Sequence, residues 1–243
     1  MNIIKLDAIH STNDYLKSLV QKQFVENLTV ITAEHQFNGR GQMGSQWLVE
    51  QGKNLTFSVL VKDLLLDINA IFHLNVAVAV SIIETLSILK IDNLAIKWPN
   101  DILAGNKKVG GILIENMIRN GGEIFSIVGI GINVNQQDFN HLPQAGSLLT
   151  VTGVEFDKTK LMLELLHNLG RNISSVMNEN TTLIWNKYHQ YLYKKNIPMA
   201  FETLDGQKVM GIIQGVNNFG KLVVLLADDT IKHYNIKEIK MLY

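Results

Sequence analysis

Charged and amide side chains gather in one short stretch of the chain, and their types suit the binding of anions. Lys97 precedes Asn100 and Asp101, and Lys108 follows at the start of an apolar run of β type. One lysine ends an expected strand and the other begins the next, so we expect both cations and the neighbouring oxygens at one end of a sheet. Lysines bind phosphates and hard oxygens bind Mg²⁺, which indicates magnesium-nucleotide chemistry. A solvated hairpin with exposed lysines is the alternative.

A glycine-rich loop forms the second group of chemical interest. Residues 39 to 44 satisfy G-x-G-x-x-G after an expected strand, but the chain continues into another strand, which argues against a dinucleotide-binding fold. Ser45 and Gln46 stand where a Walker A loop needs Lys followed by Ser or Thr. What remains is a flexible loop whose backbone N–H groups, with Arg40 and Trp47, can close over an anionic ligand. An ordinary surface loop is equally consistent with this stretch.

Two glycine pairs lie inside expected strands. Gly110 and Gly111 indicate a close backbone approach or a bulge. Gly129 and Gly131 share one face of their strand, which predicts a hollow floor for a ligand, while the intervening isoleucine faces the core. Simple sheet packing explains the second pair equally well.

The composition excludes several classes of protein. The 243 residues contain no cysteine, which rules out a disulfide scaffold, a thiolate zinc site and a cysteine nucleophile. The 22 basic residues equal the 22 acidic ones, so bulk charge favours neither nucleic acid nor an anionic membrane. No metal-ligand spacing of histidines and no G-x-S-x-G elbow occurs. The N-terminus does not resemble a secretory signal, so we expect a cytoplasmic protein that binds neither DNA nor a membrane.

The elements that must position these groups alternate between strands and helices. A helix capped by Asp67 and running to Leu89 is apolar but interrupted by polar residues, so we interpret it as a core helix and not a membrane span. Three β segments between residues 94 and 135 suggest neighbouring antiparallel strands. The other expected strands cover 2–9, 28–36 and 54–61, and the other expected helices cover 15–22, 158–177 and 181–193.

The sequence pattern changes near residue 195, from segments of helical type to short segments of β type. Beyond it, residues 198 to 240 read as four or five short strands broken by turn residues, which is typical of a small β-barrel. We therefore expect two domains, a larger one over 1–195 and a small one over 196–243.

Five motifs in order resemble the biotin protein ligase family, in its short form without a DNA-binding domain. They are Ser11-Thr12-Asn13, residues 33–47 (AEHQ leading to GRGQMGSQW), KWPNDIL at 97–103, KVGGILIE at 108–115 and GIGINVN at 129–135. The resemblance spans essentially the whole chain. It implies an α+β fold with a mixed, largely antiparallel sheet flanked by helices, followed by a small SH3-like C-terminal barrel.

The resemblance also implies an activity. Family members use ATP to activate biotin as biotinyl-5′-adenylate and then transfer it to a lysine of a biotin carboxyl carrier protein. ATP and biotin would be the substrates, and Mg²⁺ would accompany the nucleotide without a dedicated protein metal site. Asn100 and Asp101 would either help to order Mg-ATP or receive the incoming lysine. Some relatives dimerise, and whether this chain does is left open.

Roles for individual residues follow from the matching positions. Lys108, Arg40 and Asp101 are the expected catalytic groups, with Lys108 bridging the biotin carboxylate and the α-phosphate. The residues expected to bind biotin are Ser11, Thr12, Asn13, Gln36, Gly39, Arg40, Gly41, Gln42, Lys108, Gly110 and Gly111. Those expected to bind ATP or the adenylate are Arg40, Trp47, Lys97, Asn100, Lys108 and Asn133.

The glycine-rich loop departs from the family pattern. Gln42, Met43 and Ser45 occupy positions that often carry arginine, so we expect looser retention of the adenylate. Three alternatives remain: a lipoate-protein ligase, a biotin-responsive transcription factor and a non-catalytic biotin-binding protein. A lipoate-protein ligase would share the architecture. A transcription factor would need a DNA-binding segment, for which we expect no room before Ser11. A non-catalytic binding protein would have lost the phosphate-binding groups, which are present in this sequence.

Overall fold

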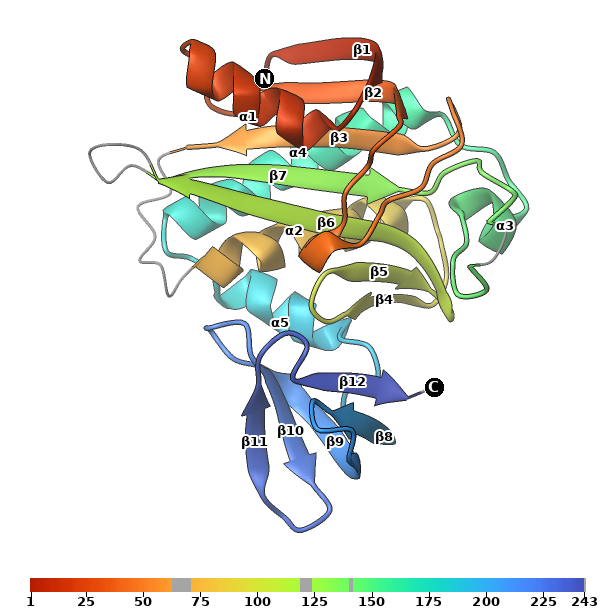
Figure 1. Ribbon diagram of the computed structural model, residues 1–243, viewed down its shortest axis with the longest axis vertical. Helices are drawn as coiled ribbons and strands as arrows, with labels where there is room; N and C mark the ends of the chain where they lie inside the picture. Colours follow the sequence, from red (N-terminus) through yellow and green to blue (C-terminus); the bar gives the residue numbers. More distant parts are fainter. Residues whose placement is uncertain (63–70, 119–123, 140–141, 243) are drawn as a thin grey trace.

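A sheet of seven strands runs through the larger part of the molecule (Figure 1). The computed structural model describes residues 1–62, 71–118, 124–139 and 142–242. Within these residues the strand order is β1-β2-β3-β7-β6-β5-β4. Only the pairing of β1 with β2 is parallel, which confirms the expected mixed, largely antiparallel sheet. The strands are β1 (Ile3–Ile9), β2 (Val30–Gln36), β3 (Leu55–Val61), β4 (Leu94–Lys97), β5 (Asp101–Ala104), β6 (Lys107–Ile118) and β7 (Ile124–Ile132).

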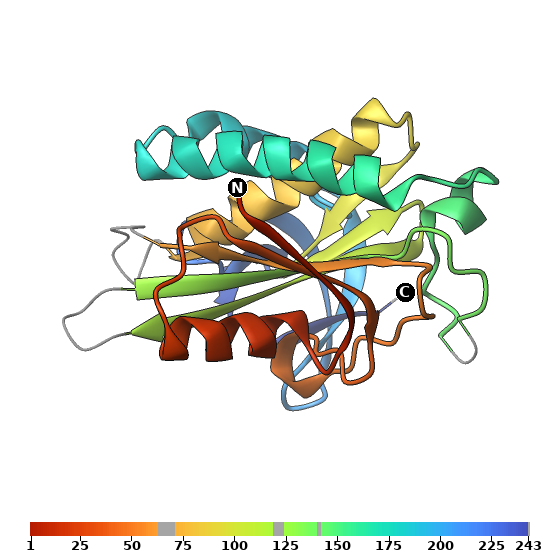
Figure 2. The same cartoon turned by 90° about the horizontal axis from the view of Figure 1, so that it is seen from above.

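Helices cover the two faces of this sheet unequally. Figure 2 shows α2 (Ile71–Ile88) and α4 (Lys158–Met177) on one face and α1 (Thr12–Lys22) on the other. Each face has its own core, because the buried residues of α2, α4 and α5 (Thr182–Gln190) form one apolar cluster and those of α1 form another. The sequence missed the short strand β5, so the stretch expected to hold three β segments holds four strands. It also missed one short helix, α3 (Leu148–Thr152), which a serine capping box opens.

Helix α2 is the apolar helix expected from the sequence. Among the described helices it is long and apolar enough to cross a membrane by length and composition, but most of it is buried inside the protein. Residues from Leu74 to Leu86 are buried almost all the way around, as in a helix that forms the centre of a large core. The expected cap, Asp67, lies outside the described residues.

A second sheet follows, below the first in the view of Figure 1. It is antiparallel, with the order β11-β10-β9-β8-β12, which confirms the expected run of short strands. The described pairings place β11 and β12 at opposite edges, so closure into a barrel remains a prediction. The strands are β8 (Pro198–Thr203), β9 (Lys208–Val216), β10 (Leu222–Leu226), β11 (Ile231–Tyr234) and β12 (Ile239–Leu242).

Candidate active site

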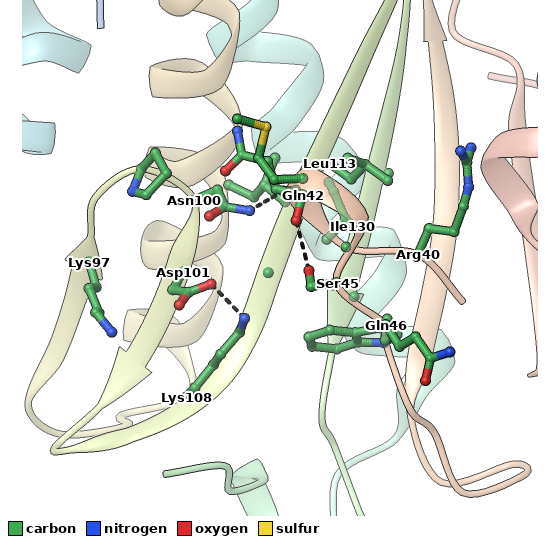
Figure 3. Close-up of a pocket in the computed structure, with 18 of the residues that line it drawn as sticks. Arg40, Gln42, Ser45, Gln46, Lys97, Asn100, Asp101, Lys108, Leu113 and Ile130 are labelled. Carbon is green, nitrogen blue, oxygen red and sulfur yellow. Dashed lines mark hydrogen bonds and ion pairs between the residues drawn. The ribbon is translucent and has the colours of Figure 1, made fainter. Parts of the chain in front are cut away.

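One cavity of about 500 Å³ collects most of the residues that the sequence singled out. The glycine-rich loop, the turn between β4 and β5 and the strands β6 and β7 all contribute to its wall (Figure 3). Residues of the second sheet also line it, so the cavity opens where the two sheets meet. The expected site residues in the lining are Ser11, Thr12, Asn13, Gln36, Arg40, Gly41, Gln42, Trp47, Lys97, Asn100, Asp101, Lys108 and Gly111.

The start of α1 forms a buried polar end of the cavity. The Ser11 hydroxyl accepts a hydrogen bond from the Asp14 amide (3.3 Å) and caps α1, which begins at Thr12, three residues before the expected start. The backbone N–H and the hydroxyl of Thr12 both donate to Gln36 Oε1, at 2.7 and 3.0 Å. Ser11, Thr12 and Asn13 are each only 3% exposed. Their donors and acceptors are therefore held in fixed directions, as recognition of a small polar ring requires.

Two residues that the sequence did not assign hold Asn13 in place. The Ser58 hydroxyl lies 2.6 Å from Asn13 Oδ1, and the Asn13 amide donates to Glu115 Oε2 at 2.9 Å. Ser58 is a fully buried hydroxyl in a strand whose other residues, Thr56 apart, are apolar, and Glu115 ends the motif that begins at Lys108. A buried polar residue in an apolar strand is a signal that could have identified Ser58.

Lys108 and Asp101 form the charged centre of the cavity. Their ammonium and carboxylate lie 2.6 Å apart, as Figure 3 shows. The ammonium is also 5.6 Å from the ring centroid of Trp47. The register of β5 against β6 shifts so that Leu103 faces Lys108 while Ile102 faces Gly110, which is the bulge expected near the glycine pair. Lys97, Asn100, Asp101 and Lys108 line one cavity, which confirms the expected cluster. The expected route to it is wrong, because β5 lies between β4 and β6 and puts Lys97 and Lys108 at its opposite ends.

Asn100 braces the turn between β4 and β5. Its backbone carbonyl accepts from the Ile112 amide (3.0 Å), and its side-chain amide donates to the Ile112 carbonyl (2.7 Å). The preceding Trp98–Pro99 peptide is cis. The turn is therefore tied to the strand that carries Lys108.

Arg40 points away from this charged centre (Figure 3). Its guanidinium forms ion pairs with Asp14 (2.5 Å) and Glu115 (2.9 Å) at the buried polar end. Arg40 was expected to contact substrate anions, but in this arrangement its guanidinium is paired with two carboxylates of the protein. Arg40 must exchange these partners if it is to reach a phosphate beside Lys108.

Gly129 and Gly131 line the cavity, as the expected floor requires, but a side chain of the site already lies over each glycine. A Cβ built on Gly129 would lie 2.4 Å from Asn13 Oδ1, and one on Gly131 would lie 2.5 Å from the Trp47 ring. These two glycines are gaps already filled by two side chains of the site. Gly129 and Gly131 therefore form part of the cavity wall and also hold two side chains that are expected to contact the ligand.

Three expected site residues are not among those that line the cavity. Gly110 lies on the other face of β6, against Ile132 and Ile102, because successive residues of a strand face opposite sides. Gly39 packs against the backbone of Trp47. The Asn133 side chain is buried and donates to the Gly146 carbonyl at 2.9 Å. These residues support the walls of the site without facing it.

Metal-binding groups are sparse in the cavity. The described residues contain no cluster of three or more His, Asp or Glu side chains that could hold a metal ion. Asp101 contributes one hard carboxylate to the lining, already paired with Lys108. Such a donor set suits Mg²⁺ that is coordinated mainly by nucleotide phosphates.

Comparison with known proteins places this geometry in a family. Residues 6–135, more than half of the chain, match the biotin/lipoate A/B protein ligase family. The chain is 30% identical over 240 residues to the bifunctional ligase/repressor BirA of Bacillus spizizenii, covering 96% of this chain and 72% of that protein. A biotin-[acetyl-CoA-carboxylase] ligase of Mycobacterium tuberculosis is 28% identical over 205 residues, covering 83% of this chain and 75% of that one.

The fold agrees with the sequence matches. The structure of the biotin protein ligase from Aquifex aeolicus in complex with biotin and ATP superposes with a TM-score of 0.82 at 26% identity, covering 99% of this chain and 98% of that one. This chain belongs to the biotin/lipoate A/B protein ligase family.

Proposed function

We propose that this protein is a biotin protein ligase, which attaches biotin to a lysine of a biotin carboxyl carrier protein at the expense of ATP. One observation carries the proposal: a single cavity joins the buried polar end around Asn13 to the Lys108–Asp101 pair. The polar end suits a small uncharged ring such as the ureido group of biotin. The charged centre suits a carboxylate and a phosphate that must be brought together.

The reaction has two steps that share this cavity. In the first, an oxygen of the biotin carboxylate attacks the α-phosphorus of ATP, which gives biotinyl-5′-adenylate and releases pyrophosphate. In the second, a lysine amine of the carrier protein attacks the carbonyl carbon of the adenylate, loses a proton and releases AMP. Neither step needs a nucleophile from the enzyme, which agrees with a site built from cations and amides.

Lys108 is the group that we expect to act in the first step. Its ammonium can lie between the biotin carboxylate and the α-phosphate, two anions that repel each other as they approach. Asp101 orients that ammonium through the 2.6 Å ion pair. Trp47, seated over Gly131 beside Lys108, offers a flat face for the adenine ring.

Mg²⁺ is expected to neutralise charge on the nucleotide phosphates when ATP is bound. Asp101 and Asn100 are the oxygen-bearing side chains of the charged centre that could approach such an ion. Because Asp101 also pairs with Lys108, it can fix the position of the lysine ammonium relative to the bound Mg²⁺.

Several finer features are proposed with this function. We place a domain boundary at 195/196, with residues 196–243 as an SH3-like barrel, in agreement with the five short antiparallel strands beyond Pro198. The acceptor is proposed to be the carrier domain of a carboxylase, since relatives are named biotin-[acetyl-CoA-carboxylase] ligases. A cytoplasmic location fits the use of ATP and a chain without cysteine. A homodimer remains a hypothesis that sedimentation can test.

The test is transfer of labelled biotin to an isolated carrier domain, together with biotin-dependent pyrophosphate release. We expect activity in the wild type and a loss of at least about 100-fold in Lys108→Ala, the size seen when one stabilising donor is removed from a transition state. Lys107→Ala is the matched control, since this neighbouring ammonium donates to the Pro143 carbonyl at 2.6 Å instead of facing the cavity.

Parallel assays with lipoate distinguish the other branch of the family. Labelled lipoate transferred to a lipoyl domain, with no transfer of biotin, would replace the proposal with a lipoate-protein ligase. Biotin binding without pyrophosphate release would replace it with a biotin-binding protein.

A further inference from the structure

A buried hydrogen bond ties the turn that carries Asn100 and Asp101 to the second sheet. The indole Nε1–H of Trp98 donates to the Gly220 carbonyl at 2.8 Å, across 122 positions of sequence. Trp98 is 6% exposed, and part of its ring borders the cavity while the N–H faces the second sheet. Buried hydrogen bonds of this kind are directional, so the contact fixes where the turn lies.

The segment that accepts this bond is itself rigid. Gly220 has a positive φ of 80°, and a Cβ at this position would lie 2.4 Å from the ring of Phe72. The Asn217 side chain accepts hydrogen bonds from the amides of Phe219 and Lys221, both at 3.0 Å. The α-carbon of Gly220 therefore packs against Phe72 near the start of α2, in a turn with little freedom, while its carbonyl accepts from Trp98.

Other contacts hold the turn between β4 and β5 from different directions. The Asn75 side chain of α2 donates to the Pro99 carbonyl at 3.0 Å. The amide and carbonyl of Ile112 bind Asn100, as described above. Trp98 supplies the third attachment, and it alone of these reaches the second sheet. Residues of that sheet and its connections, Leu222, Ile236, Lys237, Ile239, Lys240 and Met241, line the same cavity.

We propose that Trp98 and Gly220 are positioning residues for the ATP-dependent step: their hydrogen bond sets the place of Lys97, Asn100 and Asp101 relative to Lys108. This inference rests on the proposed function. Lys97 and Asn100 flank the Trp98-Pro99 pair directly in sequence, so a displaced indole displaces both. The buried polar end around Thr12 and Asn13 is built from α1, β2, β3 and β6 and has no share in this contact.

The experiment compares Trp98→Phe with Trp185→Phe. The first variant loses the N–H donor and keeps an aromatic ring. The second loses the same ring volume at a similarly buried position, 8% exposed, whose indole N–H has no hydrogen-bond partner within the described part of the chain. Thermal unfolding of both variants reports the purely structural cost.

The readouts separate the two substrates and the two steps. In biotin-dependent exchange of pyrophosphate into ATP, Trp98→Phe should lower kcat/KM for ATP about tenfold, as loss of one buried hydrogen bond predicts. Its KM for biotin should change less than about twofold, and transfer from chemically prepared biotinyl-5′-adenylate to the carrier domain should remain close to wild type. Trp185→Phe should leave all three values within about twofold.

Gly220→Ala tests the same contact from the other partner. Its Cβ meets the Phe72 ring, so the turn must shift and the ATP-dependent step should slow in the same selective way. Equal losses for biotin, ATP and adenylate transfer in Trp98→Phe, or values matching those of Trp185→Phe, would overturn the positioning role. A wild-type protein without any biotin-dependent exchange would instead overturn the proposed function.

Discussion

The guanidinium of Arg40 lies 2.9 Å from the Glu115 carboxylate, the same carboxylate that accepts a hydrogen bond from Asn13. One acidic side chain thus joins the glycine-rich loop to the buried polar end of the site. Asp14 completes the arrangement from the first turn of α1. The positive charge of Arg40 is neutralised by these two carboxylates of the protein.

Removing one of these carboxylates should favour the anionic substrate. In Asp14→Asn, Arg40 loses an ion pair whose partners are 38% and 47% exposed, and it becomes easier to recruit toward a phosphate. Exposed ion pairs of this type contribute little, so we expect KM for ATP to fall by about two- to fivefold. Steady-state exchange kinetics measure it, with Asp92→Asn, an exposed aspartate between α2 and β4, as control. A rise in KM would mean that Asp14 holds Arg40 in its productive position.

The two glycines of β7 should separate the two substrates. Gly129→Ala pushes against Asn13 and should weaken biotin binding, while Gly131→Ala pushes against Trp47 and should weaken ATP binding. Each loss should be about tenfold or more, because the contacts at 2.4 and 2.5 Å leave no room for a methyl group.

Isothermal titration with each substrate checks this pair of variants. Gly170→Ala in α4 is the control, since its Cβ would lie 3.3 Å from the end of the flexible Met1 side chain. Equal effects of both variants on both ligands would show that each substitution distorts β7 as a whole, and that Gly129 and Gly131 do not act separately on biotin and ATP binding.

The loop composition predicts how the intermediate is retained. Gln42 lines the cavity in a 3-10 turn, where its carbonyl accepts from the Ser45 hydroxyl at 2.8 Å. Gln42→Arg adds a cation that can bind the adenylate phosphate, so dissociation of biotinyl-5′-adenylate should slow by about two- to fivefold. Stopped-flow release of the adenylate measures this rate. An unchanged or faster rate would contradict looser retention by the natural loop.

Acid should weaken the attachment of α5 to the second sheet. Burial lowers the pKa of His189, a hydrogen bond to the Val216 carbonyl (2.9 Å) partly opposes this, and the charge of Lys195 lowers it further. The pKa in the folded protein is below the ordinary value of about 6.5, so protonation favours the unfolded chain. The stability is complete above that value and is lost as the pH falls through the folded-state pKa.

Urea unfolding of wild type and His189→Gln at pH 7.5 to 5 tests this effect. Glutamine places an amide near the former Nε2 and cannot titrate. We expect the stability advantage of the wild type to shrink as the pH falls. A constant difference between the two proteins would exclude His189 as the source.

The sequence predicted the positions of most elements because their signals are local. The helix at 158–177 matches α4 to the residue, since an Asp157 cap and an apolar stripe define it. The helix needs only spacing along the chain. The convergence of Lys97, Asn100, Asp101 and Lys108 on one cavity is also confirmed, but not by the expected route, because the unpredicted strand β5 separates β4 from β6 and the Lys108 side chain reaches Asp101 from the other end of β5.

The partners of the site residues could not be predicted in the same way. Arg40 binds Glu115 across 75 positions and Trp98 binds Gly220 across 122, and neither pairing leaves a trace in local periodicity. The side chains that pack on Gly129 and Gly131 could not be predicted for the same reason. Sequence indicates that a strand has gaps, but only the packed structure shows which side chain fills each gap.

The gaps at Gly129 and Gly131 also fix a length. They are two residues apart on one face of β7, so the seats of Asn13 and Trp47 are offset by about 6.6 Å along the strand. Both glycines are paired with β3 on one side and β6 on the other, which prevents β7 from slipping. The distance between Asn13 and Trp47 is therefore set by β7, and it limits how far apart the two ends of a ligand that contacts both residues can lie.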